Sequence, residues 1–111
     1  MLYIKGFSHT NTSDEEEEVV KITSTPEEPK RVKKVVITHR ITNDGILNAY
    51  IEREKVIANV EVKDSPFDGK QYEFDVDADL PEGQSFTVTL RNKTAGSNAG
   101  IVGYVAYEIT S

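Results

Sequence analysis

Three aspartates at alternate positions are the part of the sequence that most resembles a chemical site. Asp75, Asp77 and Asp79 lie in the stretch DVDADLPEG, just before a turn signal. Calcium is bound by carboxylate and carbonyl oxygens, and an EF-hand loop also needs glycine at its sixth position and glutamate at its twelfth. Counted from Asp75, these two positions hold Leu80 and Phe86. The stretch therefore does not match an EF-hand loop.

The same aspartates fit one face of a β-strand. The apolar residues Tyr72, Phe74 and Val76 alternate with acidic residues up to Asp77, and alternation with a period of two is typical of a half-buried strand. We expect Asp75, Asp77 and Asp79 to form a solvated acidic face. A weaker cation site shared with another loop or subunit is the alternative.

Residues for other kinds of chemistry are sparse. His9 and His39 have no neighbours in sequence that suggest a catalytic triad or a metal pair, and the chain has no cysteine. Motifs of the G-x-S-x-G, H-E-x-x-H and P-loop types do not occur. The sequence thus predicts a protein that is not an enzyme, with no cofactor and no metal ligands.

Two charged clusters are candidates for binding a partner. The acidic run Asp14–Glu18 is expected to be a solvated arm or a segment that orders against a partner. The basic cluster Lys30–Lys34 splits its charges between both faces of a strand, and an edge strand guarded by lysines explains it most simply. A third hypothesis is that the acidic run of one protomer meets the basic cluster of a neighbour. The partner-binding residues would be Glu15, Glu16, Glu17, Glu18, Lys30, Arg31, Lys33 and Lys34.

Length and charge limit the class of protein. A chain of 111 residues is one domain. Its net charge of −6 repels phosphate backbones and anionic lipids, so neither nucleic acid nor membrane is expected as a partner. No apolar run approaches the ~20 residues of a membrane helix, and the N-terminal residues do not resemble a signal peptide.

The pattern of the chain predicts an all-β fold. Apolar residues recur at every second position, and turn signals separate seven or eight short strands, which is typical of an antiparallel β-sandwich. A jelly roll is favoured over an immunoglobulin-like sandwich, because the chain has neither tryptophan nor a cysteine pair. We expect residues 1–29 to be an N-terminal arm with one or two short strands, and residues 30–111 to be the sandwich. Residues 46–62 are expected to form either one long bent strand or a tight hairpin.

The C-terminal third, LPEGQSFTVTLRNKTAGSNAGIVGYVAYEIT, resembles the closing strands of small jelly-roll proteins of virions. That family includes capsid decoration proteins, head-fibre proteins and receptor-binding tips of tailed phages. A glycine-rich loop also belongs to the resemblance, and the residues that carry it are Leu80, Gly83, Phe86, Val88, Leu90, Asn92, Tyr104 and Tyr107. The resemblance implies a non-enzymatic structural role, often as a trimer or bound to a capsid lattice.

The leading hypothesis is therefore a structural protein of a viral particle, either capsid decoration or a minor capsid component. It would be located in the virion, and its partners would be itself, as a homo-oligomer and plausibly a trimer, and the major capsid protein or another virion protein. The alternative is a β-sandwich module that binds a carbohydrate or a cell surface. Its contacts would come from the loops Lys63–Lys70 and Lys93–Gly100 and from the outward rings of Tyr50 or Tyr104.

Overall fold

The computed structural model describes residues 2–11, 15–40, 45–62, 72–92 and 99–110. Within these ranges the chain forms eight strands: β1 (Leu2–Asn11), β2 (Glu17–Thr23), β3 (Lys30–Arg40), β4 (Gly45–Ile51), β5 (Glu54–Val62), β6 (Tyr72–Leu80), β7 (Ser85–Asn92) and β8 (Ala99–Ile109). No helix long and apolar enough to cross a membrane occurs in these ranges.

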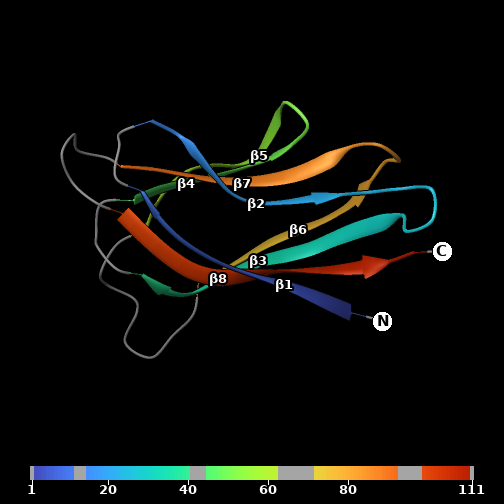
Figure 1. Ribbon diagram of the computed structural model, residues 1–111, viewed down its shortest axis with the longest axis horizontal. Helices are drawn as coiled ribbons and strands as arrows, with labels where there is room; N and C mark the ends of the chain where they lie inside the picture. Colours follow the sequence, from blue (N-terminus) through green and yellow to red (C-terminus); the bar gives the residue numbers. More distant parts are fainter. Residues whose placement is uncertain (1, 12–14, 41–44, 63–71, 93–98, 111) are drawn as a thin grey trace.

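The strands form two antiparallel four-stranded sheets that pack face to face (Figure 1). Sheet A has the order β1-β8-β3-β6, and sheet B has the order β2-β7-β4-β5. This arrangement of eight strands in two sheets is that of a jelly roll. The predicted antiparallel β-sandwich, with the jelly roll favoured, is therefore confirmed.

The inward faces of both sheets supply one core. The alternation predicted for β7 and β8 is confirmed, because Phe86, Leu90 and Ile101 are fully buried in it. They pack with Ile37 of β3 and Leu47 of β4, which are also fully buried. Each such side chain stabilises the fold by roughly 1.5–3 kcal/mol relative to an exposed position.

Residues 46–62 form the tight hairpin and not one bent strand. Ile51 of β4 pairs with Glu54 of β5, and only Glu52 and Arg53 lie between them. Glu52 has a positive φ of 54°, which lets the chain reverse in two residues. A glutamate in this conformation is uncommon, so sequence patterns for hairpins did not single it out.

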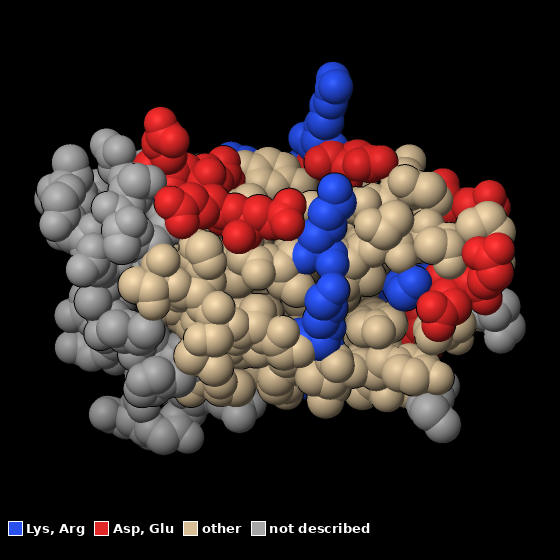
Figure 2. Space-filling view, viewed as in Figure 1, with Lys and Arg blue, Asp and Glu red and all other residues tan. Residues whose placement is uncertain are grey.

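Residues 1–29 contribute two edge strands to the sandwich. β1 pairs with β8 along its whole length, and β2 pairs with β7. The lower part of the face seen in Figure 2 is largely uncharged, apart from a column of lysine or arginine side chains near its middle. The two strands of this segment thus lie in different sheets, β1 in sheet A and β2 in sheet B.

The basic cluster lies on an interior strand, which corrects the expectation of an exposed edge. β3 is hydrogen-bonded to β8 on one side and to β6 on the other. Its register shifts between Val32 and Lys34 relative to both neighbours. Val32 and Val35 both lie in the core, so the extra residue of this bulge lets Lys33 and Lys34 face outward together and not on opposite faces.

Candidate functional site

The outer face of sheet A brings charged side chains from three strands into rows. Residues that pair across antiparallel strands share a face. The first row contains Leu2, Glu108, Arg31 and Asp79; the second contains Ile4, Ala106, Lys34 and Asp75; the third contains Gly6, Tyr104, Val36 and Glu73. Acidic and basic groups therefore alternate across β8, β3 and β6 in the first row, and Lys34 lies opposite Asp75 in the second.

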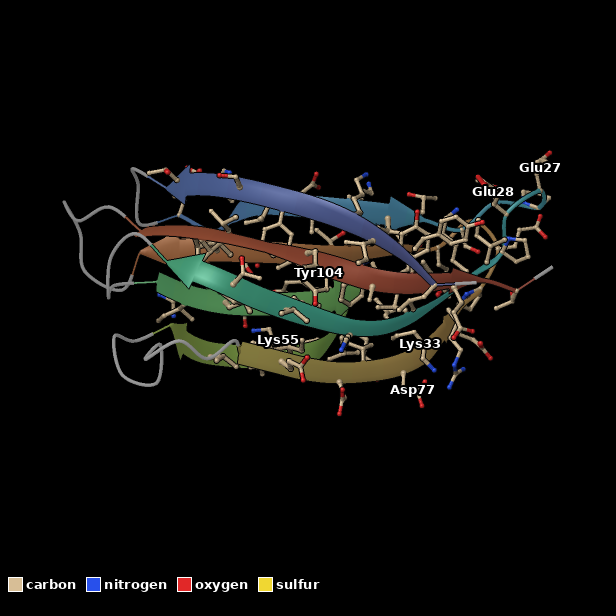
Figure 3. The ribbon with its side chains drawn as sticks, turned by 90° about the horizontal axis from the view of Figure 1, so that it is seen from below. Glu27, Glu28, Lys33, Lys55, Asp77 and Tyr104 are labelled. Atoms are coloured by element: carbon tan, nitrogen blue, oxygen red, sulfur yellow. The ribbon has the colours of Figure 1, made fainter. Side chains whose placement is uncertain are left out.

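Two further charged groups lie between the first two rows, because both neighbouring strands are irregular there. Lys33 is the bulge residue of β3, and Asp77 of β6 has a positive φ of 47°. Aspartate tolerates this left-handed region better than most residues. The Lys33 Nζ and Asp77 Oδ1 atoms are 2.9 Å apart, and Figure 3 shows the two residues together at one end of their strands.

Arg31 neutralises two of the three alternating aspartates. Its Nη1 donates to Asp79 Oδ1 at 2.8 Å, and its Nη2 donates to the carbonyl oxygen of Asp77 at 2.9 Å. The hydrogen bond from Lys33 and the charge of Arg31 hold the pKa of Asp77 below its ordinary value. Among the described residues, no group of three or more His, Cys, Asp or Glu side chains is placed to hold a metal ion.

A hollow of 470 Å³ lies beside this ion-pair network, and we call it the sheet A hollow. Its lining residues are Leu2, Lys33, Lys34, Asp75, Asp77 and Glu108. Two lysines against three carboxylates give this lining a formal charge of −1. Asp75 is exposed and forms no hydrogen bond or ion pair with another described residue, although its negative charge helps to raise the pKa of Lys34.

The predicted basic residues separate into two groups. Lys34 Nζ donates to Glu73 Oε1 at 3.1 Å, a hydrogen bond that raises the pKa of Lys34. With Arg31 and Lys33, it lies on the outer face of sheet A. Lys30 instead donates from Nζ to the carbonyl oxygens of Thr23 and Glu28 and so holds the connection between β2 and β3.

The predicted acidic residues lie just before β2 and in its first two positions. Glu16 accepts hydrogen bonds from Tyr50 Oη at 2.6 Å and from Thr89 Oγ1. Burial opposes ionisation of Glu16, but these two donors and nearby positive charges keep its pKa below the ordinary value. Glu17 Oε1 lies 3.0 Å from His9 Nε2 and connects β2 to β1, while Glu15 and Glu18 are exposed.

The two tyrosines predicted as ligand contacts lie on opposite outer faces of the sandwich. Tyr50 is on β4 of sheet B, where Lys55 Nζ lies 5.6 Å from the centre of its ring. Tyr104 is on β8 of sheet A, in the row next to Lys34, and is half-buried. One ligand cannot contact both in the same molecule. Of the predicted loops, residues 63–70 and 93–98 lie outside the described residues.

Sequence reasoning missed the hollow and the network of Arg31 with Asp77. The alternation of apolar and acidic residues correctly predicted that the three aspartates lie on one face of the strand. It did not indicate that Asp77 adopts a left-handed backbone conformation. One signal was present in the segment VKKV, since Val32 and Val35 are an odd number of residues apart. A regular strand cannot place both on the same face, so this spacing indicates a bulge if both valines belong to one core.

The fold and this surface define a jelly-roll β-sandwich with a hollow on one outer face that is lined by charged side chains and Leu2. Among solved structures, the chain is similar to the CBM36-1 domain of a multidomain xylanase from the hindgut metagenome of Trinervitermes trinervoides. The TM-score is 0.52 at 8% sequence identity, over 92% of this chain and 77% of that one, so the likeness concerns the fold. No family model matches the sequence, and no curated protein does.

Proposed function

We propose that this protein is a carbohydrate-binding module that takes a neutral sugar at the sheet A hollow. The observation that carries the proposal is the lining of the hollow, where ammonium and carboxylate groups lie beside the apolar side chain of Leu2. Sugar hydroxyls donate and accept hydrogen bonds, so they can use groups of both kinds. Hydrogen bonds to charged groups are about twice as strong as those between neutral groups.

The negative charge of the lining indicates that the hollow would bind neutral sugars and not anionic ones. The lining has more carboxylates than lysines, and the whole chain carries a net charge of −6. An anionic sugar would be repelled by both, because a field of one sign lowers the local concentration of ligands of the same sign. Neutral glycans are therefore favoured over those with uronic acid, sialic acid or sulfate groups.

Tyr104 is the aromatic side chain proposed to extend the site. It lies on the same outer face, between Gly6 of β1 and Val36 of β3, and Figure 3 shows it nearer the middle of the sandwich than Lys33 and Asp77. The absence of a side chain at Gly6 leaves one side of the ring open to a ligand. A volume of 470 Å³ lies within the range of small-molecule sites.

The fold supports this function without selecting it. CBM denotes a carbohydrate-binding module, and the domain to which this chain is similar carries that name. Jelly rolls occur both as lectin domains and as viral capsid proteins, and one fold hosts many functions. The chemistry of the sheet A hollow is what favours a sugar.

A structural protein of a viral particle is the second candidate, and the jelly-roll strand order is compatible with it, since capsid proteins use the same arrangement. Such a protein would act through protein contacts and would have no need of a sugar. Co-sedimentation with capsids, together with a lack of retention on any glycan, would favour this candidate over the first.

A glycan array that carries neutral and anionic glycans, including xylan fragments, tests the proposed function. We expect retention of the protein on one or more neutral glycans and weaker retention on matched glycans with acidic groups. Retention that increases with the number of acidic groups would contradict the proposed site, because it would require a positive surface. No retention on any glycan would contradict the proposed class of protein.

A further inference from the structure

The edge strand β1 differs from the other three edge strands of the sandwich in its regularity. β2, β5 and β6 each pair with their neighbour through shifts of register. β1 pairs with β8 in one continuous register, from Leu2 opposite Glu108 to Asn11 opposite Ala99. Bulges and irregularities protect an edge strand from pairing with another chain, and this device is absent from β1.

The charges of β1 also differ from those of the other edges. Its sequence LYIKGFSHTN contains no acidic residue and one lysine, in a chain with a net charge of −6. Lys5 Nζ donates to the carbonyl oxygen of Lys21 on β2 at 3.1 Å. This hydrogen bond directs the ammonium group toward sheet B and away from the open edge of sheet A.

Exposed apolar side chains gather on the same strand. Leu2, Tyr3 and Ile4 are 53%, 37% and 62% exposed, and the only other large hydrophobic residue exposed to this degree among the described residues is Val56. Contiguous exposed apolar side chains indicate an interaction surface. On a regular edge strand, that surface suits a partner strand.

We propose that the partner is a second copy of this chain, which pairs antiparallel along β1 with Ile4 on the two-fold axis. The two copies of sheet A would then form one continuous sheet. In this register Ile4 lies opposite Ile4, Leu2 opposite Gly6, and Tyr3 opposite Lys5. An isologous interface uses the same surface patch on both copies, so that patch must be complementary to itself. In this register no two like charges lie opposite each other.

The contacts in this register follow from the rows of sheet A. Gly6 has no side chain, so Leu2 of the second copy can reach over it to Tyr104, which pairs with Gly6 on β8. Tyr3 and Lys5 would lie opposite each other through their backbones, and the Lys5 ammonium group can keep its hydrogen bond to Lys21. Although the whole chain has a net negative charge, the two β1 strands do not repel each other through carboxylates, because neither strand contains one.

Neighbouring registers fit less well. With Lys5 on the axis, the two lysines would lie directly opposite each other, which is destabilising in a sheet. With Gly6 on the axis, Ile4 would lie opposite Ser8 and lose its apolar partner. With Tyr3 on the axis, Leu2 would lie opposite Ile4, but only residues 2–4 of the described strand would pair, whereas the register centred on Ile4 pairs residues 2–6.

Disulfide cross-linking tests the register, because the chain has no cysteine of its own. Directly opposite residues have Cβ atoms about 4.5–5.5 Å apart, so Ile4→Cys should give a covalent dimer under mild oxidation. Ser8→Cys is the matched control, since Ser8 points to the same face of β1 and should stay monomeric on a non-reducing gel. Equal cross-linking of both variants, or of neither, would overturn the proposal.

Sedimentation velocity tests the interface itself. Wild type should sediment as a dimer, and Ile4→Lys should sediment as a monomer with an unchanged circular dichroism spectrum, because the side chain is exposed. A wild type that stays monomeric up to about 1 mM would overturn the proposal. Ile4 does not line the sheet A hollow, but Leu2 does, so the interface and the proposed sugar site share a border. The masses of wild type and Ile4→Lys test the interface without any readout of sugar binding.

Discussion

The guanidinium group of Arg31 holds both the backbone and the side chain of Asp77. Nη2 donates to the Asp77 carbonyl oxygen at 2.9 Å, and Nε donates to Asp77 Oδ1 at 3.2 Å. Asp77 has a φ of 47°, a conformation that few residues other than glycine adopt. Arg31 therefore fixes the irregular segment of β6 that lies next to the sheet A hollow.

The ion pairs of Asp77 should make stability depend on acid pH. The pKa of Asp77 is below its ordinary value of 3.8 because of the hydrogen bond from Lys33 and the charge of Arg31. The stabilising effect is therefore present above the unfolded pKa and is lost as pH falls through the folded pKa. We expect wild type to lose more free energy of unfolding than Asp77→Asn between about pH 5 and about pH 2. The difference should be small, since the groups are exposed.

Urea unfolding at a series of pH values measures this difference. Asparagine tolerates the left-handed conformation, so the variant keeps the backbone of the bulge while it loses the charge. Parallel pH profiles for wild type and Asp77→Asn would show that the ion pairs do not contribute.

Calcium should not stabilise the protein through the three aspartates. Arg31 and Lys33 already form ion pairs with the carboxylates of Asp77 and Asp79, at nitrogen–oxygen distances of 2.8–3.1 Å. A calcium ion would have to displace these two side chains. We expect the melting temperature to stay the same when millimolar calcium is added. A rise in the melting temperature that Asp77→Ala abolishes would contradict this account and support the alternative of a cation site.

Gly103 should be required for the close packing of β8 against β3. A Cβ atom at this position would lie 2.1 Å from the carbonyl oxygen of Val36 and 3.0 Å from the ring of Phe7. We expect Gly103→Ala to destabilise the protein by about 1–3 kcal/mol, as overpacking in a core does. Gly6→Ala is the matched control, because the nearest atom to its Cβ would lie at 3.8 Å.

Denaturant unfolding at low protein concentration compares the two glycine variants. Equal stabilities for Gly103→Ala and Gly6→Ala would contradict the described contact of β8 with β3.

Tyr50 should titrate at a higher pH than an ordinary tyrosine. Its hydrogen bond to Glu16 raises its pKa above 10.0, because the carboxylate favours the protonated phenol. Glu16→Gln should lower the pKa of Tyr50. Difference absorbance spectra against Tyr50→Phe isolate this group from the other tyrosines, and an unchanged titration in Glu16→Gln would contradict the hydrogen bond.

The fold was predictable from sequence where alternation is regular. Phe86, Val88 and Leu90 lie in the core as expected, because a period of two directly fixes which side chains share a face of β7. The order of strands in each sheet is less accessible. β3 pairs with β6 and β8, far along the chain, and no local pattern in Lys30–Lys34 distinguishes an interior strand from an edge.

The candidate site was less predictable because it depends on two irregularities. Lys33 and Asp77 face each other only because the registers of β3 and β6 both shift at this point. Tyr104 was expected to face outward, and it does. Its position on the face opposite to Tyr50 follows from the distribution of strands between the two sheets, which alternation does not determine.

The proposed sugar site is tested most directly by the affinity of an Asp75 variant for a glycan that wild type retains. Asp75 lines the sheet A hollow and forms no hydrogen bond or ion pair with another described residue, so Asp75→Asn should fold normally. Glu82→Gln is the matched control, since Glu82 is exposed in the turn between β6 and β7. We expect Asp75→Asn to raise the dissociation constant about tenfold, the effect of one charge-assisted hydrogen bond, and Glu82→Gln to leave it unchanged. Equal dissociation constants for wild type and Asp75→Asn would contradict the sheet A hollow as the binding site.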